Sequence, residues 1–241
     1  MKKYFLYFFA ALLTSCQVTE TIHLNENGSG TIAISKLRDE QSYMHVVGEE
    51  YSKEDFYTDT TYLFKDVLAK HAETFARLPL YEKAIFEKFK TVQVHSKKSS
   101  IEKIVQTTIS QPFSKIEEVA DLYKTEEYAD DIVNNYALIA EEHYYSVNFT
   151  FDGITFKRIV KITDQAELKK QQEEIERLKT RFSKFKIEQN FILKYYFPRK
   201  IKSVSNANAK ISDDKKSIEV QFLITDCLVN PEITALEVVL E

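Results

Sequence analysis

The strongest constraint on the fold is that apolar side chains switch repeatedly between a two-residue and a helical period. The clearest two-residue period runs over residues 147–156, where Val147, Phe149 and Phe151 alternate with polar residues up to Asp152-Gly153. Alternation on both sides of an Asp-Gly pair is typical of a β-hairpin with a type I′ turn. We therefore expect antiparallel sheet in the middle of the chain.

A second hairpin is expected near the N-terminus. Ile22 and Leu24 alternate with polar residues before residues 25–30 break the pattern, and the alternation then resumes over residues 31–35. We expect Gly28 and Gly30 to supply positive φ in this turn.

Further strands are expected from the same alternation in later segments. They are residues 92–94 and 105–109, joined by a turn at 96–100, and residues 191–197, 201, 218–224 and 236–240, with a hairpin turn at 213–216. Strands therefore dominate the last third of the chain.

Helical spacing predicts the remaining elements. Residues 43–90 are interpreted as mainly helical, with Asp59 as a helix cap and a restart at Pro79. The pair Ser114 and Glu117 matches a capping box, and further helical patterns occupy residues 132–139 and 165–189.

The stripe Leu168, Ile175, Leu178, Phe182 and Phe185 of the long helix has two interpretations. It either packs on the chain's own sheet or forms a short seam for a partner helix. The order of elements predicts an α+β fold, with antiparallel β-hairpins and a C-terminal multi-stranded sheet packed with several amphipathic helices.

The first sixteen residues are typical of an export signal. Lys2 and Lys3 precede an apolar run over residues 4–13, which is shorter than the about 20 residues that cross a bilayer. The following Leu13-Thr14-Ser15-Cys16 resembles the lipobox of bacterial lipoproteins. That resemblance implies cleavage between Ser15 and Cys16 and attachment of a lipid to Cys16. The alternative is a plain signal peptide followed by an incidental cysteine.

These signals predict how the chain is divided and where it resides. We expect a cleaved signal peptide at 1–15 and one α+β lipoprotein domain at 16–241, which allows a helical insertion around 43–90. The first strand begins a few residues after Cys16, so the folded body is expected close to the membrane. The expected location is the bacterial cell envelope, in the outer membrane, with the periplasmic and surface leaflets both open.

Charge and glycine content exclude several classes of function. Without the two signal lysines the formal net charge of −4 becomes −6, and lysines alternate with acids, so we expect no nucleic-acid partner. The chain has only four glycines, and the glycine motifs that hold nucleotides or present a nucleophilic serine are absent.

Few residues suggest catalysis. The five histidines (His23, His45, His71, His95 and His143) are scattered, so we expect no metal site, and we expect neither catalytic residues nor a cofactor. Acidic neighbours such as Glu126-Glu127 point apart on a helix and favour a solvated face over glycoside hydrolysis. Cys227 is expected to be a free thiol that packs as a small apolar residue.

Two segments, residues 20–31 and 195–201, look like parts of uncharacterised lipoproteins of Bacteroidota, and the first also resembles LppM-like lipoprotein domains of mycobacteria. The resemblance implies an envelope-anchored α+β domain without established enzymatic activity, with lipid or glycolipid as candidate ligands. Asp59-Thr60-Thr61 also resembles the O-glycosylation acceptor of Bacteroidota, and helix capping is its alternative explanation.

Three functional hypotheses follow from the sequence. The preferred one is a non-enzymatic module that binds or scaffolds a lipid, glycolipid or envelope protein, held to the membrane through lipidated Cys16. The alternative is a hydrolase acting on glycan or lipid, with a site assembled only in the fold. A third is a subunit that presents the stripe of residues 168–185 to a partner. An apolar cavity at the Cys16 end would favour the first.

Overall fold

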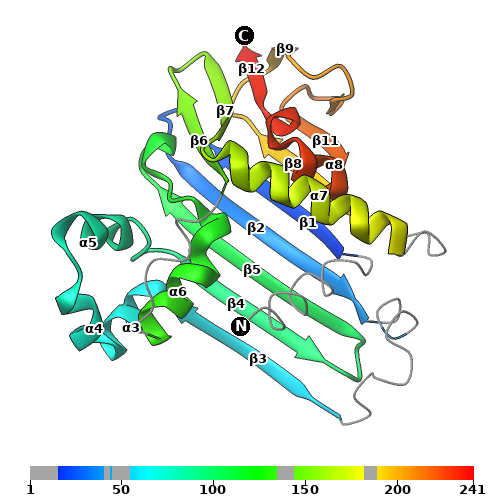
Figure 1. Ribbon diagram of the computed structural model, residues 1–241. Helices are drawn as coiled ribbons and strands as arrows, with labels where there is room; N and C mark the ends of the chain where they lie inside the picture. The colour runs from blue at the N-terminus through cyan, green and yellow to red at the C-terminus, as the bar shows by residue number, and fades with distance from the viewer. Residues whose placement is uncertain (1–15, 41–43, 45–54, 135–143, 182–188) are drawn as a thin grey trace.

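The computed structural model describes residues 16–40, 44, 55–134, 144–181 and 189–241. Within these residues the chain forms two β-sheets with helices packed around them (Figure 1). The predicted α+β class is confirmed.

The larger sheet has eight strands in the order β10-β11-β8-β1-β2-β5-β4-β3. Their bounds are β1 (Cys16–Leu24), β2 (Gly30–Asp39), β3 (Tyr57–Leu63), β4 (Gln93–Ser99), β5 (Ile104–Phe113), β8 (Asn190–Tyr196), β10 (Lys210–Ile211) and β11 (Ser217–Leu223). Neighbours are antiparallel except β1 and β8, which run parallel. The sheet is therefore mixed.

The smaller sheet is antiparallel, with the order β6-β7-β12-β9. Its strands are β6 (Tyr145–Phe151), β7 (Thr155–Ile162), β9 (Ile201–Val204) and β12 (Leu236–Leu240). The C-terminal strands are thus divided between the two sheets.

Among the described residues, the helices are α3 (Phe64–Lys70), α4 (Ala72–Arg77), α5 (Leu80–Glu87), α6 (Thr125–Asn134), α7 (Gln165–Arg181) and α8 (Ile224–Val229). Three 3₁₀ turns lie at Ile116–Glu118, Leu122–Lys124 and Pro231–Thr234. In the described part of the chain, no helix combines the length and apolar character that a membrane span requires.

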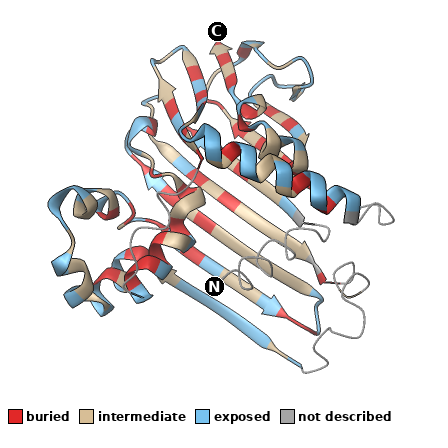
Figure 2. Cartoon of the chain, viewed as in Figure 1, coloured by how far each residue is buried: buried red, intermediate tan, exposed pale blue. Residues whose placement is uncertain are grey.

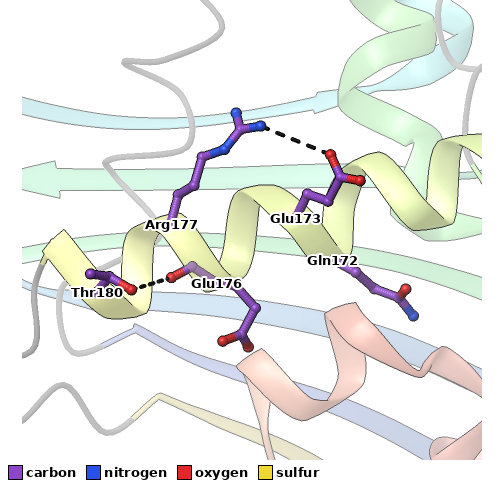
Figure 3. Close-up of a pocket in the computed structure, with 5 residues that line it drawn as sticks. All are labelled: Gln172, Glu173, Glu176, Arg177 and Thr180. Carbon is purple, nitrogen blue, oxygen red and sulfur yellow. Dashed lines mark hydrogen bonds and ion pairs between the residues drawn. The ribbon is translucent and has the colours of Figure 1, made fainter.

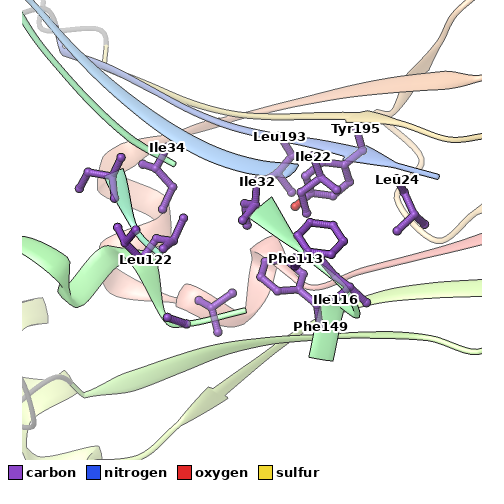
Figure 4. Packing of buried hydrophobic residues seen from close by; sticks show 14 of the residues in the cluster. Ile22, Leu24, Ile32, Ile34, Phe113, Ile116, Leu122, Phe149, Leu193 and Tyr195 are labelled. Atoms are coloured by element: carbon purple, nitrogen blue, oxygen red, sulfur yellow. The ribbon is translucent and has the colours of Figure 1, made fainter. Parts of the chain in front are cut away.

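The core lies where the inner faces of the two sheets meet. Alternate residues of β1, β2 and β8 point inward, and Figure 4 shows Ile22, Ile34 and Tyr195 among these buried side chains. From the smaller sheet, Phe156 packs edge-on against Tyr195 with ring centroids 5.3 Å apart. Each such side chain contributes roughly 1.5–3 kcal/mol by its burial.

A second part of the core lies under the helices. Phe86 packs edge-on against Tyr128 of α6 at 5.2 Å between ring centroids, and Phe89 lies 5.0 Å from the same ring. In Figure 2 the buried segments therefore run through α3 and α6 as well as along the sheet.

Both predicted hairpins form, but each turn differs from the expectation. Gly28 has a φ of 79°, as expected, whereas Gly30 does not have positive φ. Gly30 is needed for close approach, because a Cβ there would lie 2.0 Å from the carbonyl oxygen of His23.

The Asp152-Gly153 turn is not type I′, which requires positive φ at both central residues. Only Gly153 has positive φ, and Phe151 pairs with Phe156, which leaves four residues in the connection. The Asp152 carboxylate shapes it by accepting hydrogen bonds from the N–H groups of Ile154 (2.9 Å) and Thr155 (2.7 Å).

The helical interpretation of residues 43–90 is correct from Phe64 to Glu87 and wrong for residues 57–63, while residues 43 and 45–54 lie outside the described residues. Residues 57–63 form edge strand β3, so Asp59 is not a cap, and its carboxylate instead contacts His95 Nε2 at 2.7 Å. The N–H group of Leu63 donates to Asp66 at the start of α3, and the restart after Pro79 occurs as predicted.

Two other local predictions are wrong. The turn between β4 and β5 falls at residues 100–103 rather than 96–100. Ser114 and Glu117 do not cap an α-helix, because two 3₁₀ turns precede α6 and Glu117 instead accepts a hydrogen bond from the N–H group of Phe151 at 2.7 Å.

Helix α7 buries its apolar stripe. Leu168, Ile175 and Leu178 are each at most 8% exposed, and the helix contacts α8. A hydrogen bond from Gln172 to the carbonyl of Val229, 2.8 Å long, fixes this packing. These three side chains are thus not presented to a partner, while Phe182 and Phe185 lie outside the described residues.

Candidate functional site

An apolar cavity of about 390 Å³ lies between the first strands of the larger sheet and the segment that contains α8. Its lining comes from β1, β2, β5, β6, β7, β8, α6, α8 and the 3₁₀ turns at 122–124 and 231–234. Binding pockets for small ligands typically measure about 300–1,000 Å³.

Most of the lining is apolar. The contributing side chains are Val18, Val105, Tyr145, Phe191, Ile224, Cys227, Leu228 and Pro231. A cavity lined by such groups favours an apolar ligand over water, because water needs several polar partners.

The cavity lies at the Cys16 end of β1. Val18 lines it two residues after Cys16. The backbone of Cys16 pairs with Arg38 of β2, Arg38 pairs with Val105 of β5, and both Arg38 and Val105 also line the cavity. An apolar cavity at this end is the feature named above as favouring a binding module. The structure contains such a cavity.

Three polar lining residues, Tyr123, Arg158 and Thr234, belong to one hydrogen-bonded cluster, the Glu20 network, which also contains Glu20 and Tyr195. Arg158 donates from Nε to Glu20 Oε1 at 3.0 Å and from Nη2 to Glu20 Oε2 at 3.2 Å. The hydroxyls of Tyr123 (2.6 Å) and Tyr195 also donate to the carboxylate. Each carboxylate oxygen of Glu20 therefore accepts two hydrogen bonds.

Arg158 is satisfied on its other side by Thr234. Its Nη1 donates to the Thr234 carbonyl at 3.2 Å and to the hydroxyl oxygen at 2.6 Å, while the guanidinium lies 5.6 Å from the centre of the Phe191 ring. The side chains of Arg158 and Glu20 are 2% and 0% exposed. The buried charges thus compensate each other within the protein.

Burial sets the protonation of this network. It raises the pKa of Tyr123 and Tyr195 well above the ordinary value, and the Glu20 charge adds to that effect. Burial alone would lower the pKa of Arg158, but the charge of Glu20 and the nearby tyrosines outweigh it and raise that pKa. The tyrosines therefore stay neutral donors and the arginine stays charged.

Charged side chains line the same cavity on β2 and α6. Lys36 forms an ion pair with Glu126, and Arg38 forms one with Glu40. Lys36, Arg38, Glu126 and Glu127 are all lining residues, so charges of both signs occur beside the apolar wall.

Cys227 is a half-buried free thiol in the cavity wall. Desolvation raises its pKa to about 12. A thiol with so little thiolate is a poor nucleophile, in agreement with its interpretation as a packing residue.

The predicted anchor residues are only partly within the described chain. Cys16 is the first residue of β1, and Ser15 lies outside the described residues. The cleavage and lipid attachment predicted there stay predictions.

Four neighbouring tyrosines in or next to the strands have different surroundings. Tyr195 joins the Glu20 network, whereas Tyr196 stacks on His23 with ring centroids 4.3 Å apart. Tyr144 donates to the Leu228 carbonyl at 3.0 Å, and Tyr145 lines the cavity. Sequence reasoning missed Glu20 and Arg158, although both occupy inward positions of alternating strands.

The candidates for catalysis are not brought together. Among the described residues, no group of three or more His, Cys, Asp or Glu side chains could hold a metal ion. No histidine belongs to the described cavity lining, and His45 and His143 lie outside the described residues.

A shallower depression of about 750 Å³ follows α7 and is shown in Figure 3. Its lining residues, Gln172, Glu173, Glu176, Arg177 and Thr180, all lie on that one helix. Arg177 faces Glu173 at 3.9 Å, and the Thr180 hydroxyl donates to the carbonyl of Glu176 at 2.9 Å. No group from another described element converges on it, so the cavity next to β1 is the better candidate.

Comparisons with known proteins give little beyond this geometry. No protein-family model matches the chain, and no curated protein matches it either. Among solved structures, one that aligns with this chain is the NMR structure of the folded domain of LppM from Mycobacterium tuberculosis. The alignment covers 95% of this chain and 90% of the LppM chain, with 8% sequence identity and a TM-score of 0.39.

Proposed function

We propose that this chain is a lipoprotein of the bacterial cell envelope that binds an acyl chain of a lipid or glycolipid in its cavity. The observation that carries the proposal is the apolar cavity of about 390 Å³ that begins two residues after Cys16. In this account residues 1–15 are removed, Cys16 holds residues 16–241 at the outer membrane as one domain, and the role is binding rather than catalysis.

The state of the Glu20 network indicates which end of the ligand enters. Arg158 is neutralised by Glu20 and hydrogen-bonded to Thr234, so the buried cation is already compensated. A ligand carboxylate or phosphate placed beside it would add an uncompensated buried charge, which is costly. The apolar end of the ligand is therefore the end that enters.

The ligand's polar group then stays near the charged lining residues. Lys36 and Arg38 are each paired with an acid, so both signs of charge are available there. We expect chain length to affect affinity more than headgroup charge, since each buried methylene contributes about 0.8 kcal/mol.

A substitution in β1 tests this site. Val18→Phe narrows the cavity with a larger side chain and keeps high strand propensity, whereas Thr19→Phe places the same side chain on the opposite face of the strand. Purified protein is titrated with the neutral fluorescent probe N-phenyl-1-naphthylamine. We expect Val18→Phe to weaken binding about tenfold or more, a loss of at least about 1.4 kcal/mol, and Thr19→Phe to leave it unchanged.

Competition separates the two ends of the ligand. A long-chain alcohol and a fatty acid of equal length should displace the probe at similar concentrations. Equal probe affinity in both β1 variants would contradict the cavity as the site, and strong preference for the fatty acid would contradict entry by the apolar end.

The anchor is tested separately. Intact mass measurement of the protein purified from membranes should give a chain that begins at Cys16 and carries diacylglycerol. An unmodified Cys16, or a chain that still carries residues 1–15, would contradict the anchor without affecting the binding test.

A further inference from the structure

The start of β1 and the turn between β4 and β5 lie at the same end of the larger sheet. The register shows this step by step: Cys16 pairs with Arg38, Arg38 pairs with Val105, and the adjacent Ile104 pairs with Ser99. Ser99 in turn pairs with Tyr57, the first residue of β3 (Figure 1). With about 4.8 Å between neighbouring strands, the turn is about 12 Å from β1 across the sheet.

This end carries two exposed large apolar side chains. Ile101, within the turn, is 77% exposed, and Tyr57 is 62% exposed. Lys98 and Lys103 on either side of Ile101 are exposed too, and so is Glu102, which forms an ion pair with Lys97. A single exposed apolar residue is ordinary in proteins, but isoleucine and tyrosine beside lysines are the combination that suits a membrane interface.

The turn is held in place by backbone and side-chain hydrogen bonds. The N–H group of Ser100 donates to the Phe56 carbonyl at 3.0 Å, and that of Phe56 donates to the Ser100 hydroxyl at 2.9 Å. The N–H group of Glu102 donates to the Ser99 hydroxyl at 3.1 Å. Ile101 is therefore presented on a braced turn, so little conformational entropy is lost when it is buried against another surface.

We propose that the turn at residues 100–103, together with Tyr57, contacts the lipid bilayer and holds this end of the sheet against it. The inference rests on the proposed lipid anchor at Cys16, because an anchor at this end of β1 brings the turn to the membrane surface. The same orientation places the Cys16 end of β1, beside which the cavity lies, toward the source of acyl chains.

Tryptophan fluorescence tests this contact directly, because the chain contains no tryptophan. Ile101→Trp introduces one reporter in the turn. Ile154→Trp is the matched control, since Ile154 is 55% exposed in the β6–β7 connection, at the end of β1 remote from Cys16. A Cβ on Gly28, in the β1–β2 turn, would lie 3.8 Å from Phe151, which confirms the position of that connection.

The lipid-anchored protein is reconstituted into phosphatidylcholine and phosphatidylglycerol vesicles, with and without brominated lipid. We expect Ile101→Trp to show a blue shift on vesicles and to lose most of its emission to brominated lipid, while Ile154→Trp emits as it does in water. An unshifted, unquenched Ile101→Trp would overturn the proposal, and so would equal quenching of both reporters.

The experiment also separates this inference from the proposed function. If the protein floats with vesicles through its lipid but Ile101→Trp is not quenched, the contact fails and the anchor stands. If Cys16 carries no lipid and the protein does not float, the anchor fails, and with it the basis of the contact.

Discussion

Glu20 and Arg158 lie 138 positions apart in the sequence and form a two-point ion pair with almost no exposure to solvent. Glu20 belongs to β1 of the larger sheet and Arg158 to β7 of the smaller one. The pair therefore joins the two sheets next to the cavity, and its hydrogen bonds to Tyr123, Tyr195 and Thr234 fix the geometry of that wall.

Removing one partner of this pair should be costly. Glu20→Met or Arg158→Met leaves the other group charged, buried and uncompensated, and we expect each to lower the free energy of unfolding by about 3–5 kcal/mol. The double variant Glu20→Met/Arg158→Met should recover much of that loss, because no unpaired charge remains. Urea unfolding of the four proteins gives the coupling energy, and single losses below about 1 kcal/mol would contradict this account.

Gly30 is predicted to be far less tolerant than Gly153. A Cβ at Gly30 would lie 2.0 Å from the His23 carbonyl oxygen, so the backbone must move, and we expect Gly30→Ala to cost about 3 kcal/mol or more. Gly153→Ala has open space but a φ of 94°, and should cost about 1–2 kcal/mol. Thermal or urea unfolding of both variants ranks them, and the reverse order would contradict the role of Gly30.

Local patterns predicted the hairpins because both strands and their turn lie within a few residues. The apolar alternation of β1 and β2 and of β6 and β7 was sufficient for this. The parallel pairing of β1 with β8 could not be predicted in the same way, since it joins Gln17 to Asn190 and depends on the whole intervening chain.

Edge strand β3 was missed for a different physical reason. The sequence of residues 57–63 is polar on both faces for most of its length, and its first five residues are exposed, so no apolar face signals a strand. The Glu20 network was missed because sequence patterns assign an acidic residue to the surface unless its buried partner is known. Glu20 lies two residues before Ile22 and four before Leu24, on the same face of β1. This spacing is the signal that sequence reasoning could have used.

Cys227 should react slowly in the folded protein. Its pKa is about 12 against an ordinary value of 9.0, mainly because of desolvation, so almost no thiolate is present near pH 8. We expect labelling by a charged disulfide reagent to accelerate as pH rises toward 12 and to become fast at pH 8 in urea. Bound ligand should slow it further, because Cys227 lines the cavity.

The same shift has a consequence for stability. Because the folded pKa is raised, the contribution of the neutral thiol is fully present below pH 9 and is lost as pH rises through about 12, while the unfolded chain releases its proton first. As pH rises from 9 to about 12, the free energy of unfolding should therefore fall less for Cys227→Ala than for the unsubstituted protein. Identical pH profiles, or rapid labelling of the folded protein at pH 8, would contradict the buried position of the thiol.

Helix α7 should act as a core element. Ile175 is 2% exposed, and Ile175→Ala should lower the free energy of unfolding by about 2–4 kcal/mol. Its neighbour Glu176 is mostly exposed, and Glu176→Ala should change stability by no more than about 0.5 kcal/mol. Urea unfolding with size-exclusion chromatography checks both, and dissociation of an oligomer without loss of stability in Ile175→Ala would instead indicate a subunit interface.

Native mass spectrometry of the protein purified from bacterial membranes tests the central claim, acyl-chain binding next to β1, most directly. We predict a population with the additional mass of one noncovalent lipid, which is present in Thr19→Phe and absent in Val18→Phe. A lipid-free spectrum for the unsubstituted protein, or equal lipid occupancy in both variants, would contradict the account.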